Sequence, residues 1–466
     1  MTSYYMEAAG SSMGSSARAL LPCRSVLTAT KLPHEPNKGR PRHFAVSLAL
    51  TNDKNIIAVA LSAPLNNVLL YKIQTFERIV SNTQALNGNN NNIIEGPRNI
   101  REIKFSPADK NLLVMVGESG VRCLYFKEDN GVMAWSSMAI TSLDTHTLAF
   151  GCGGGLLACG HENGVITFWD ANNQIGGTLR NQEVDQRSRH QPSTLSPIGE
   201  YNSSHTDAVL TLGFHPQDDT KLVSAAADGT CNFYNVSAKS EDEAYLMTWT
   251  SPNKSDIVQF FTYTDRQTQQ QMVGLVTSTH SLSLWSVESG ECKAVVLCSN
   301  LEEFSDTGPN HGKERKGTSI VHLGFDYIAD VAFDEGRDMF IISAGKYVNR
   351  KLYRLASPAA YVNGGWCSNE GDGPVIFDKS MIQVDCELNE GHYGVVRDVL
   401  WVDGSACLTC GEDAKLCLWA NNDLDGEQHM PNSDGRTVVV HNQAEKRKLG
   451  GSLNSTGGTK TRKRMM

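Results

Sequence analysis

The sequence lacks the features that mark membrane-spanning and disulfide-stabilised proteins. No segment approaches the roughly 18 consecutive apolar residues that a membrane-spanning helix needs. Cysteines number only 12 in 466 residues, and residues 1–24 contain no apolar core of a secretory signal, so we expect reduced thiols. These absences argue against an integral membrane protein and predict a nuclear or cytoplasmic location without a membrane partner. The Ser- and Ala-rich start, with Arg18 and Arg24, leaves an organellar transit peptide as the alternative.

The chain also lacks an overall excess of positive charge. It has 42 Lys and Arg against 51 Asp and Glu, a net charge of −9. Residues 436–466 carry eight basic side chains and one acidic one, so that segment is +7 and the remainder is −16. This distribution argues against a body that coats nucleic acid and predicts an acidic body with a basic tail.

What the sequence does contain is an internal repeat. Three segments share a polar turn and then an alternating strand that ends in an aromatic residue six positions after the turn, and four weaker copies follow the same pattern. The intervals between these aromatic residues run from 44 to 68, and the shortest match the ~40–45-residue period of a propeller blade. The seven copies end at Tyr71, Tyr125, Trp169, Tyr234, Trp285, Tyr353 and Trp419.

Apolar residues within each copy alternate with period 2, which indicates short strands and no long helix. We therefore predict an all-β, seven-bladed β-propeller over residues 25–420, a disordered segment 1–24 and a flexible tail 421–466. A strand at 25–31 is expected to complete the last blade, and 436–441 is the competing candidate. The connections 173–203, 299–324 and 357–390 are expected outside the sheets.

The best copies resemble WD repeats, in which a His, a Ser or Thr, a turn Asp and a Trp form one hydrogen-bonded set inside the blade. The seventh copy matches all four positions, and the fourth has Tyr234 in place of the Trp. The third keeps Trp169 and Asp170, but has Asn163 at the turn and Cys159 at the hydroxyl position. The resemblance therefore implies a structural role for His392, Thr409, Asp413 and Trp419, and for His205, Ser224 and Asp228.

More narrowly, the runs 205–209, 214–216 and 411–419, with a basic tail after the last copy, are similar to the WD repeat-containing protein 89 family. This resemblance implies the fold and carries no biochemical activity with it.

Three patterns suggest chemistry that their context does not support. His392, Asp413 and Thr409 could be taken for a hydrolase triad, but a buried network that satisfies a turn is the favoured interpretation. The run 151–155 is rich in glycine, but a strand rather than a helix follows it, so we expect a turn. Cys407 and Cys410 have metal-ligand spacing, but residues three apart on a strand face opposite sides. We expect no catalytic site, no metal and no cofactor.

The remaining candidate is the rim of the propeller. In WD-repeat propellers, partners commonly dock on the loops before the first strand of each blade and on the turns between its second and third strands. The glutamates among these positions could form an acidic docking arc, or could simply be polar turn residues. The matching positions here are Asn99, Arg101, Glu118, Asp144, His146, Glu162, Asp256, Tyr327, Lys346, Val395, Arg397 and Glu412.

Two basic clusters in the tail resemble a bipartite nuclear localisation signal, and a solvated, solubilising tail is the alternative. They consist of Lys446, Arg447 and Lys448, and of Lys460, Arg462, Lys463 and Arg464.

These observations favour a non-catalytic protein-interaction scaffold, with a monomeric propeller inside a larger assembly and, in the sharper version, a basic protein partner. The alternative is a factor that contacts RNA or DNA through the basic tail. An enzyme built on the central funnel ranks third, and clustered titratable groups on the channel would be its mark.

Overall fold

A computed structural model describes the parts of the chain that form the sheets. The residues described are 21–25, 44–75, 77–79, 94–129, 132–181, 195–215, 218–251, 256–264, 270–290, 292–297, 320–322, 326–334, 339–345, 352–358, 383–388, 392, 394–403, 406–413, 415–420, 428–431 and 437–440. No helix among them is long and apolar enough to cross a membrane. The chain divides into two compact units, residues 1–421 and 422–466.

The strands described in the first unit form seven sheets of four or five strands, and each predicted copy supplies three strands of one sheet. The first three sheets are consecutive in the chain. They contain β2 (Ala45–Leu50), β3 (Ile56–Leu61), β4 (Asn67–Lys72), β5 (Arg78–Ile79) and β6 (Ile94–Glu95); β7 (Ile100–Phe105), β8 (Leu112–Gly117), β9 (Gly120–Asp129) and β10 (Val132–Thr141); and β11 (Thr145–Gly151), β12 (Leu156–His161), β13 (Ile166–Asp170) and β14 (Gly199–Tyr201).

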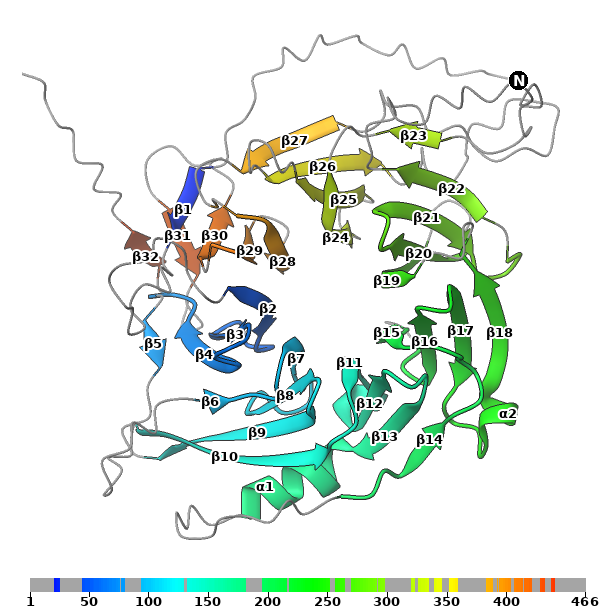
Figure 1. Ribbon diagram of the computed structural model, residues 1–466. Helices are drawn as coiled ribbons and strands as arrows, with labels where there is room; N and C mark the ends of the chain where they lie inside the picture. Colours follow the sequence, from blue (N-terminus) through cyan, green and yellow to red (C-terminus); the bar gives the residue numbers. More distant parts are fainter. Residues whose placement is uncertain are drawn as a thin grey trace, which may run out of the picture. The chain divides into compact units, whose positions relative to one another are not determined.

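The next three sheets continue this order around the ring (Figure 1). They contain β15 (Val209–Phe214), β16 (Lys221–Ala226), β17 (Thr230–Asn235) and β18 (Tyr245–Thr250); β19 (Ile257–Thr264), β20 (Gln271–Thr277), β21 (Ser281–Ser286), β22 (Cys292–Leu297) and β23 (Ile320–His322); and β24 (Tyr327–Asp334), β25 (Met339–Gly345), β26 (Leu352–Pro358) and β27 (Gln383–Leu388).

The last sheet is composite, because it joins the two ends of the unit. β28 (Val396–Asp403), β29 (Ala406–Gly411) and β30 (Leu416–Ala420) are completed by β1 (Leu21–Ser25), which pairs antiparallel with β30. Six sheets are thus contiguous in sequence and one is not. The closing strand is N-terminal, but it occupies 21–25 and not the expected 25–31. The competing segment instead forms β32 (Thr437–Val440), which pairs with β31 (Gln428–Pro431) in the second unit.

The sheets form a closed ring in the first unit. The innermost strands contact one another in the order β2, β7, β11, β15, β19, β24 and β28, and β28 contacts β2 (Figure 1). The core lies between neighbouring sheets, so that a middle strand such as β8 is buried on both faces. A sheet covered on both sides needs apolar residues at every position, which explains the run LLVMVG in β8. The predicted all-β propeller is confirmed.

Two local predictions were incomplete. The connection expected outside the sheets at 173–203 contains the strand β14, and the other two contain β23 and β27. A one-turn π-helix (Ala171–Gly176) also leads into α1 (Gly177–Asn181), and Ile175 and Leu179 pack against the sheet of β7–β10. β14 has three residues, two of them exposed, so its apolar pattern in the sequence is weak.

Candidate functional site

The mouth of the central channel is formed by one equivalent residue from each blade. Every innermost strand has a register shift just after its start, and a bulge of this kind leaves one residue unpaired and redirects its side chain. All seven of these residues, which we call the bulge ring, line a central cavity of about 540 Å³. The bulge ring consists of Val46, Arg101, His146, Leu210, Val258, Ala329 and Arg397.

The predicted rim glutamates lie at equivalent turns beside this ring. The backbone N–H groups of Glu118, Glu162 and Glu412 donate to the carbonyl groups of Arg98, Asp144 and Val395, at 2.8, 2.9 and 2.9 Å. These bonds place each glutamate next to the start of the innermost strand of its own blade.

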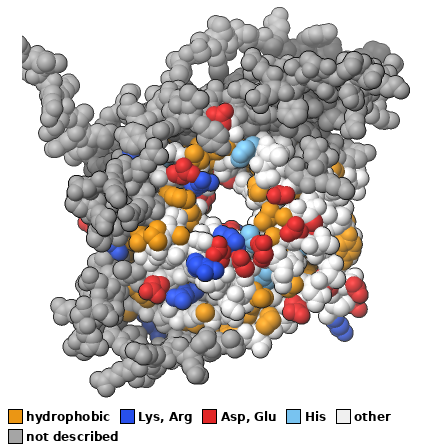
Figure 2. All heavy atoms as spheres, viewed as in Figure 1, with side chains coloured by type: hydrophobic (Ala, Val, Ile, Leu, Met, Phe, Trp, Pro, Cys, Tyr) orange, Lys and Arg blue, Asp and Glu red, His pale blue; other side chains and the backbone are white. Residues whose placement is uncertain are grey.

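Each carboxylate on this part of the rim has a basic partner. Glu118 pairs with Arg98 at 3.0 Å and also accepts a hydrogen bond from Asn99. The other three pairs are Arg101 with Asp144, His146 with Glu162, and Arg397 with Glu412. Arg101 and Asp144 come from neighbouring blades, so this ion pair also joins two sheets. The acidic residues named over these blades thus have basic side chains as neighbours, and Figure 2 shows acidic and basic side chains together beside the opening.

The other predicted rim residues lie in different environments. Asp256 is exposed, and its carbonyl accepts a hydrogen bond from Ser278 N at 2.9 Å. Tyr327 is buried, its hydroxyl accepts from Val396 N at 3.2 Å, and its ring meets His280 edge-on. Val395 is half-buried. Lys346 lies outside the described residues.

Below the bulge ring, a second set of polar side chains connects the blades across the channel wall. Leu48 N donates to Asp398 Oδ2 at 2.7 Å, and Ile103 N donates to Ser47 Oγ at 3.3 Å. Leu148 N donates to Glu102 Oε2 at 2.9 Å. In each bond the acceptor is the residue directly after the bulge in one blade, and the donor is a backbone N–H on the innermost strand of the next blade. These three acceptors were not predicted from the sequence, although each of them directly follows a bulge residue.

Two carboxylates on the channel wall, those of Asp398 and Asp330, lie in an environment that disfavours their charged forms. Burial raises the pKa of Asp398 to about 7 and that of Asp330 to about 6. The proximity of Asp330 raises the pKa of Asp398 further, while Gln259 Nε2 donates to Asp330 Oδ1 at 2.6 Å. Titratable groups thus do gather on the channel, as an enzyme built on the funnel would require. Asp398 and Glu102, however, use their carboxylates to hydrogen-bond the backbone of the neighbouring blade, which is a structural role.

The four residues expected to form a hydrogen-bonded set in the seventh copy are brought together inside the composite blade. His392 Nδ1 lies 3.0 Å from Asp413 Oδ1, and His392 Nε2 lies 2.7 Å from Thr409 Oγ1. Trp419 Nε1 donates to the same Thr409 oxygen at 2.7 Å. Thr409 is fully buried, so no substrate can reach its hydroxyl group, and a triad on these residues is unsupported.

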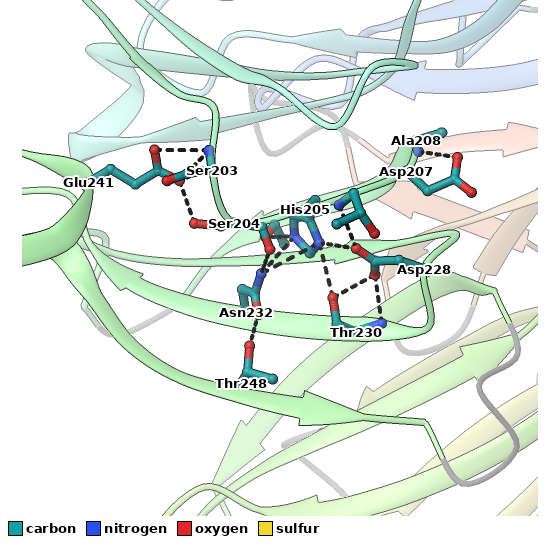
Figure 3. A network of polar contacts seen from close by, with 12 residues as sticks. Ser203, Ser204, His205, Asp207, Ala208, Asp228, Thr230, Asn232, Glu241 and Thr248 are labelled. Carbon is teal, nitrogen blue, oxygen red and sulfur yellow. Dashed lines mark hydrogen bonds and ion pairs between the residues drawn. The ribbon is translucent and has the colours of Figure 1, made fainter.

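The fourth copy builds a larger network of the same kind (Figure 3). His205 Nε2 lies 2.6 Å from Ser224 Oγ, and His205 Nδ1 lies 3.2 Å from Asp228 Oδ2 and 3.1 Å from Thr230 Oγ1. Burial acts to raise the pKa of Asp228, but hydrogen bonds from His205 and Thr230 outweigh it and hold this pKa well below its ordinary value. Asn232 extends the network to Ser204 and Thr248.

The third copy uses a histidine that the sequence analysis did not select. His161 lies at the end of β12, with Nδ1 2.9 Å from Thr145 Oγ1 and Nε2 2.6 Å from Thr167 Oγ1. Burial lowers its pKa to about 4. Neither Cys159 nor Asn163 takes part in these two bonds. The sequence signal for this role was a histidine directly before the turn. The WD-repeat motif places its histidine elsewhere, so matching the motif does not select His161.

The other two suggestive patterns have structural explanations. Cys407 packs on the face of the composite blade that includes Trp419, whereas Cys410 packs on the opposite face, against the sheet of β2. Residues 152–154 form a single 3₁₀ turn between β11 and β12. The basic residues of the tail, 446–448 and 460–464, lie outside the described part of the chain.

Comparison with known proteins agrees with the repeat pattern. The family model "WD domain, G-beta repeat" matches residues 196–235. The WD repeat-containing protein 89 homolog of Dictyostelium discoideum is 25% identical over 231 residues, which are 49% of this chain and 54% of that protein. The histone acetyltransferase type B subunit 2 of Schizosaccharomyces pombe is 33% identical over 90 residues, 19% of this chain and 18% of that protein. The chain thus spans about half and about a fifth of the lengths of these relatives.

Among solved structures, a chain of the mitotic checkpoint complex superposes with a TM-score of 0.50 at 14% identity, covering 84% of this chain and 98% of that one. This likeness shows the fold alone. The predicted resemblance to WD repeats and to WD repeat-containing protein 89 is confirmed.

Proposed function

We propose that this chain is a non-catalytic protein-interaction platform, a seven-bladed propeller closed by the composite blade, which holds a protein partner at the mouth of its channel within a larger assembly. The observation that carries the proposal is the bulge ring. Seven equivalent backbone irregularities direct seven side chains to one opening, beside turns rich in charged residues. Such a rigid set of loops on a closed scaffold is suited to binding another protein.

Rigidity supports this function. The wall hydrogen bonds and the pair of Arg101 with Asp144 connect neighbouring blades, so the rim keeps its shape before a partner arrives. A preformed surface loses little conformational entropy on binding.

The partner in this proposal is basic. Among the described residues, ten carboxylates lie at the rim and on the channel wall against four Lys and Arg, and the whole chain carries a net charge of −9. Opposite charge accelerates encounter and makes binding sensitive to salt. The ten are Glu102, Glu118, Asp144, Glu162, Asp207, Asp256, Asp326, Asp330, Asp398 and Glu412, and the four are Arg98, Arg101, Lys104 and Arg397.

A tagged full-length chain, purified from cells at moderate salt, tests this function by mass spectrometry of the proteins that accompany it. We expect basic proteins to be enriched, and to be reduced by the triple variant Glu118→Lys, Glu162→Lys, Glu412→Lys, because three charge reversals make the whole mouth repel a basic partner even where the glutamates do not touch it. The matched control reverses three exposed glutamates away from the mouth, Glu77, Glu200 and Glu288. Enrichment of acidic or neutral proteins alone would reject the basic partner. If the control variant lost as much of the basic partners as the rim variant, the binding site would lie elsewhere.

The basic tail is proposed as a nuclear address rather than a contact. Its two clusters have the spacing of a bipartite import signal. A truncation to residues 1–443 should shift a fluorescently tagged chain from nucleus to cytoplasm and retain the same partners. Partners or nucleic acid lost with the tail would instead assign the contact to the last 23 residues.

A further inference from the structure

The bulge ring has two chemically different halves. The blades of β28, β7 and β11 contribute the basic side chains Arg397, Arg101 and His146, and Val46 of β2 lies between Arg397 and Arg101 in the ring. The three consecutive blades of β15, β19 and β24 contribute only apolar residues, which are Leu210, Val258 and Ala329. Val258 is 43% exposed, although it points into a cavity mouth where a soluble monomer has no need of an apolar side chain.

The turn position that holds a glutamate in the other half holds a small, uncharged residue in two of the three blades of the apolar half. Ala227 N donates to Ala208 O at 2.9 Å, and Ser278 N donates to Asp256 O at 2.9 Å. These bonds show that Ala227 and Ser278 occupy the positions held by Glu118, Glu162 and Glu412 in the other half. These two positions therefore lack the long acidic side chains of the other half, while His280, in the same turn as Ser278, also lines the cavity.

Carboxylates flank this apolar half, and among the described residues they differ from those opposite in forming no ion pair. Asp207 and Asp256 are both exposed, and neither forms an ion pair with any residue in the described part of the chain. The carboxylate of Asp207 accepts a hydrogen bond from Ala208 N at 2.7 Å and lies apart from the buried network of His205 (Figure 3). Beside the opening, on the side of β15 and β19, Figure 2 shows apolar and acidic side chains together.

The channel wall adds to this negative potential. Asp330 follows the bulge residue Ala329 and faces the same cavity, with Asp398 on the next blade. Within the described ranges neither pairs with a Lys or Arg, and burial makes the ionised form of each carboxylate costly, which raises the pKa of both. A cation brought by a partner would relieve this cost, whereas an acidic partner would increase it.

We propose that this apolar and acidic half of the mouth, formed by Leu210, Val258, Ala329, Asp207 and Asp256, docks a short partner segment in which an aliphatic or aromatic side chain neighbours a Lys or Arg. The apolar side chain covers Val258 and Leu210, which removes their exposed surface from water. The basic side chain reaches Asp207 or Asp256, or enters the channel toward Asp330. This inference rests on the proposed function and assigns its site to three of the seven blades.

The proposal also explains why the opposite half is not the docking site. A basic segment placed over Arg101 and Arg397 would have to displace ion pairs that are already formed, and it would meet the displaced guanidinium groups. An acidic segment placed over the same two arginines would also have to break these ion pairs, and the displaced carboxylates would repel it. Asp207 and Asp256, which form no ion pair within the described ranges, can accept a charged group without breaking a described pair first.

A random peptide library displayed on phage, selected against the immobilised full-length chain, is the direct probe. We expect enriched peptides to place Lys or Arg next to Leu, Ile, Met, Phe or Trp. Fluorescence anisotropy with one labelled, selected peptide then measures affinity for the variants. The pair Asp207→Asn with Asp256→Asn should weaken binding about tenfold, and Val258→Ser should weaken it several-fold.

The matched control neutralises two carboxylates of the other half, Glu162→Gln with Glu412→Gln, and should change affinity less than twofold. Thermal unfolding of each variant identifies any loss of fold. Enrichment of acidic peptides, a failure to enrich any peptide, or a larger effect from the control pair than from the Asp207 and Asp256 pair would overturn the proposal. Copurification of a basic partner that is insensitive to Asp207, Asp256 and Val258 would leave the interaction function standing and remove only this site.

Discussion

Pairs of a basic side chain with a carboxylate occur in two regions of this propeller, inside the blades and at the mouth of the channel. Inside, the side chain of His392 is 3% exposed and its partner Asp413 8%. At the mouth, the side chain of Arg397 is 47% exposed and its partner Glu412 35%. Asp413 and Glu412 are neighbours in the same turn, but their side chains point into different environments.

This comparison teaches that burial, and not residue type, decides what a charge pair contributes. A buried pair that loses one partner leaves the other desolvated without compensation, whereas water replaces a partner lost at the surface. The interior pairs should therefore control stability and the mouth pairs should control recognition. The predictions below test this division, beginning with the largest effect.

Asp413→Ala should lower the free energy of unfolding by about 3 kcal/mol, because it leaves His392 Nδ1 without its partner and also removes a bond to Lys415 N. Urea unfolding followed by tryptophan fluorescence measures the change. The adjacent Glu412→Ala is the control, and should cost under about 1 kcal/mol. Equal losses in the two variants would show that the two environments do not differ in the way described.

Thr409→Val should cost about 1–3 kcal/mol at nearly constant volume. It removes the oxygen that accepts the hydrogen bond of Trp419 Nε1 and contacts His392 Nε2, and a buried polar group without a partner is destabilising. Thr211→Val, on the channel wall, is the same change at a site with solvent access and should cost less. If the channel variant proved the more destabilising, the wall and not the blade interior would be the critical polar layer.

Asp398→Asn should raise stability by about 1 kcal/mol at pH 8 and less at pH 5. The pKa of Asp398 is raised to about 7 in the folded chain, so between about pH 4 and pH 7 the folded state binds more protons than the unfolded state. Stability from this group therefore falls as pH rises through that window. The asparagine oxygen can still accept from Leu48 N but does not ionise.

Thermal unfolding of both forms from pH 5 to pH 8 measures the difference. Asp330 remains as a titrating neighbour on the wall, so the pH dependence should flatten without disappearing. Parallel curves for the two forms would mean that Asp398 is not strained by its burial.

Glu162→Gln together with Glu412→Gln should change the free energy of unfolding by less than about 0.5 kcal/mol. Both carboxylates are partly exposed, and exposed ion pairs contribute little. The same variants should also lower the salt dependence of stability only slightly. A loss comparable to that of Asp413→Ala would assign the mouth pairs a structural role.

Much of the fold followed from the sequence because its signals are local. A period-2 apolar pattern, a polar turn and a terminal aromatic residue fall within about 30 residues, and all seven such segments supply three strands of one sheet. The outer strands were harder to predict. β14 and β27 lie in segments expected outside the sheets, because a strand of three to six residues within a long polar connection gives little apolar pattern.

The site was predictable only in part. Aligning the repeats selected Arg101, His146 and Arg397 at their equivalent positions, but it did not select Leu210, Val258 or Ala329, because apolar residues near a strand start look like core residues. The partners of the rim glutamates were also beyond the sequence. Arg101 and Asp144 are 43 residues apart and meet only where two blades pack together.

The sequence by itself therefore determined the repeating unit, its all-β character and the polar set of the composite blade, because each depends on spacing within one copy. Tertiary structure decided which residues close the ring, since β1 and β30 are separated by nearly the whole chain. It also decided which carboxylates at the mouth are neutralised and which are not, because charge pairing depends on the distance between blades in space and not on separation along the chain.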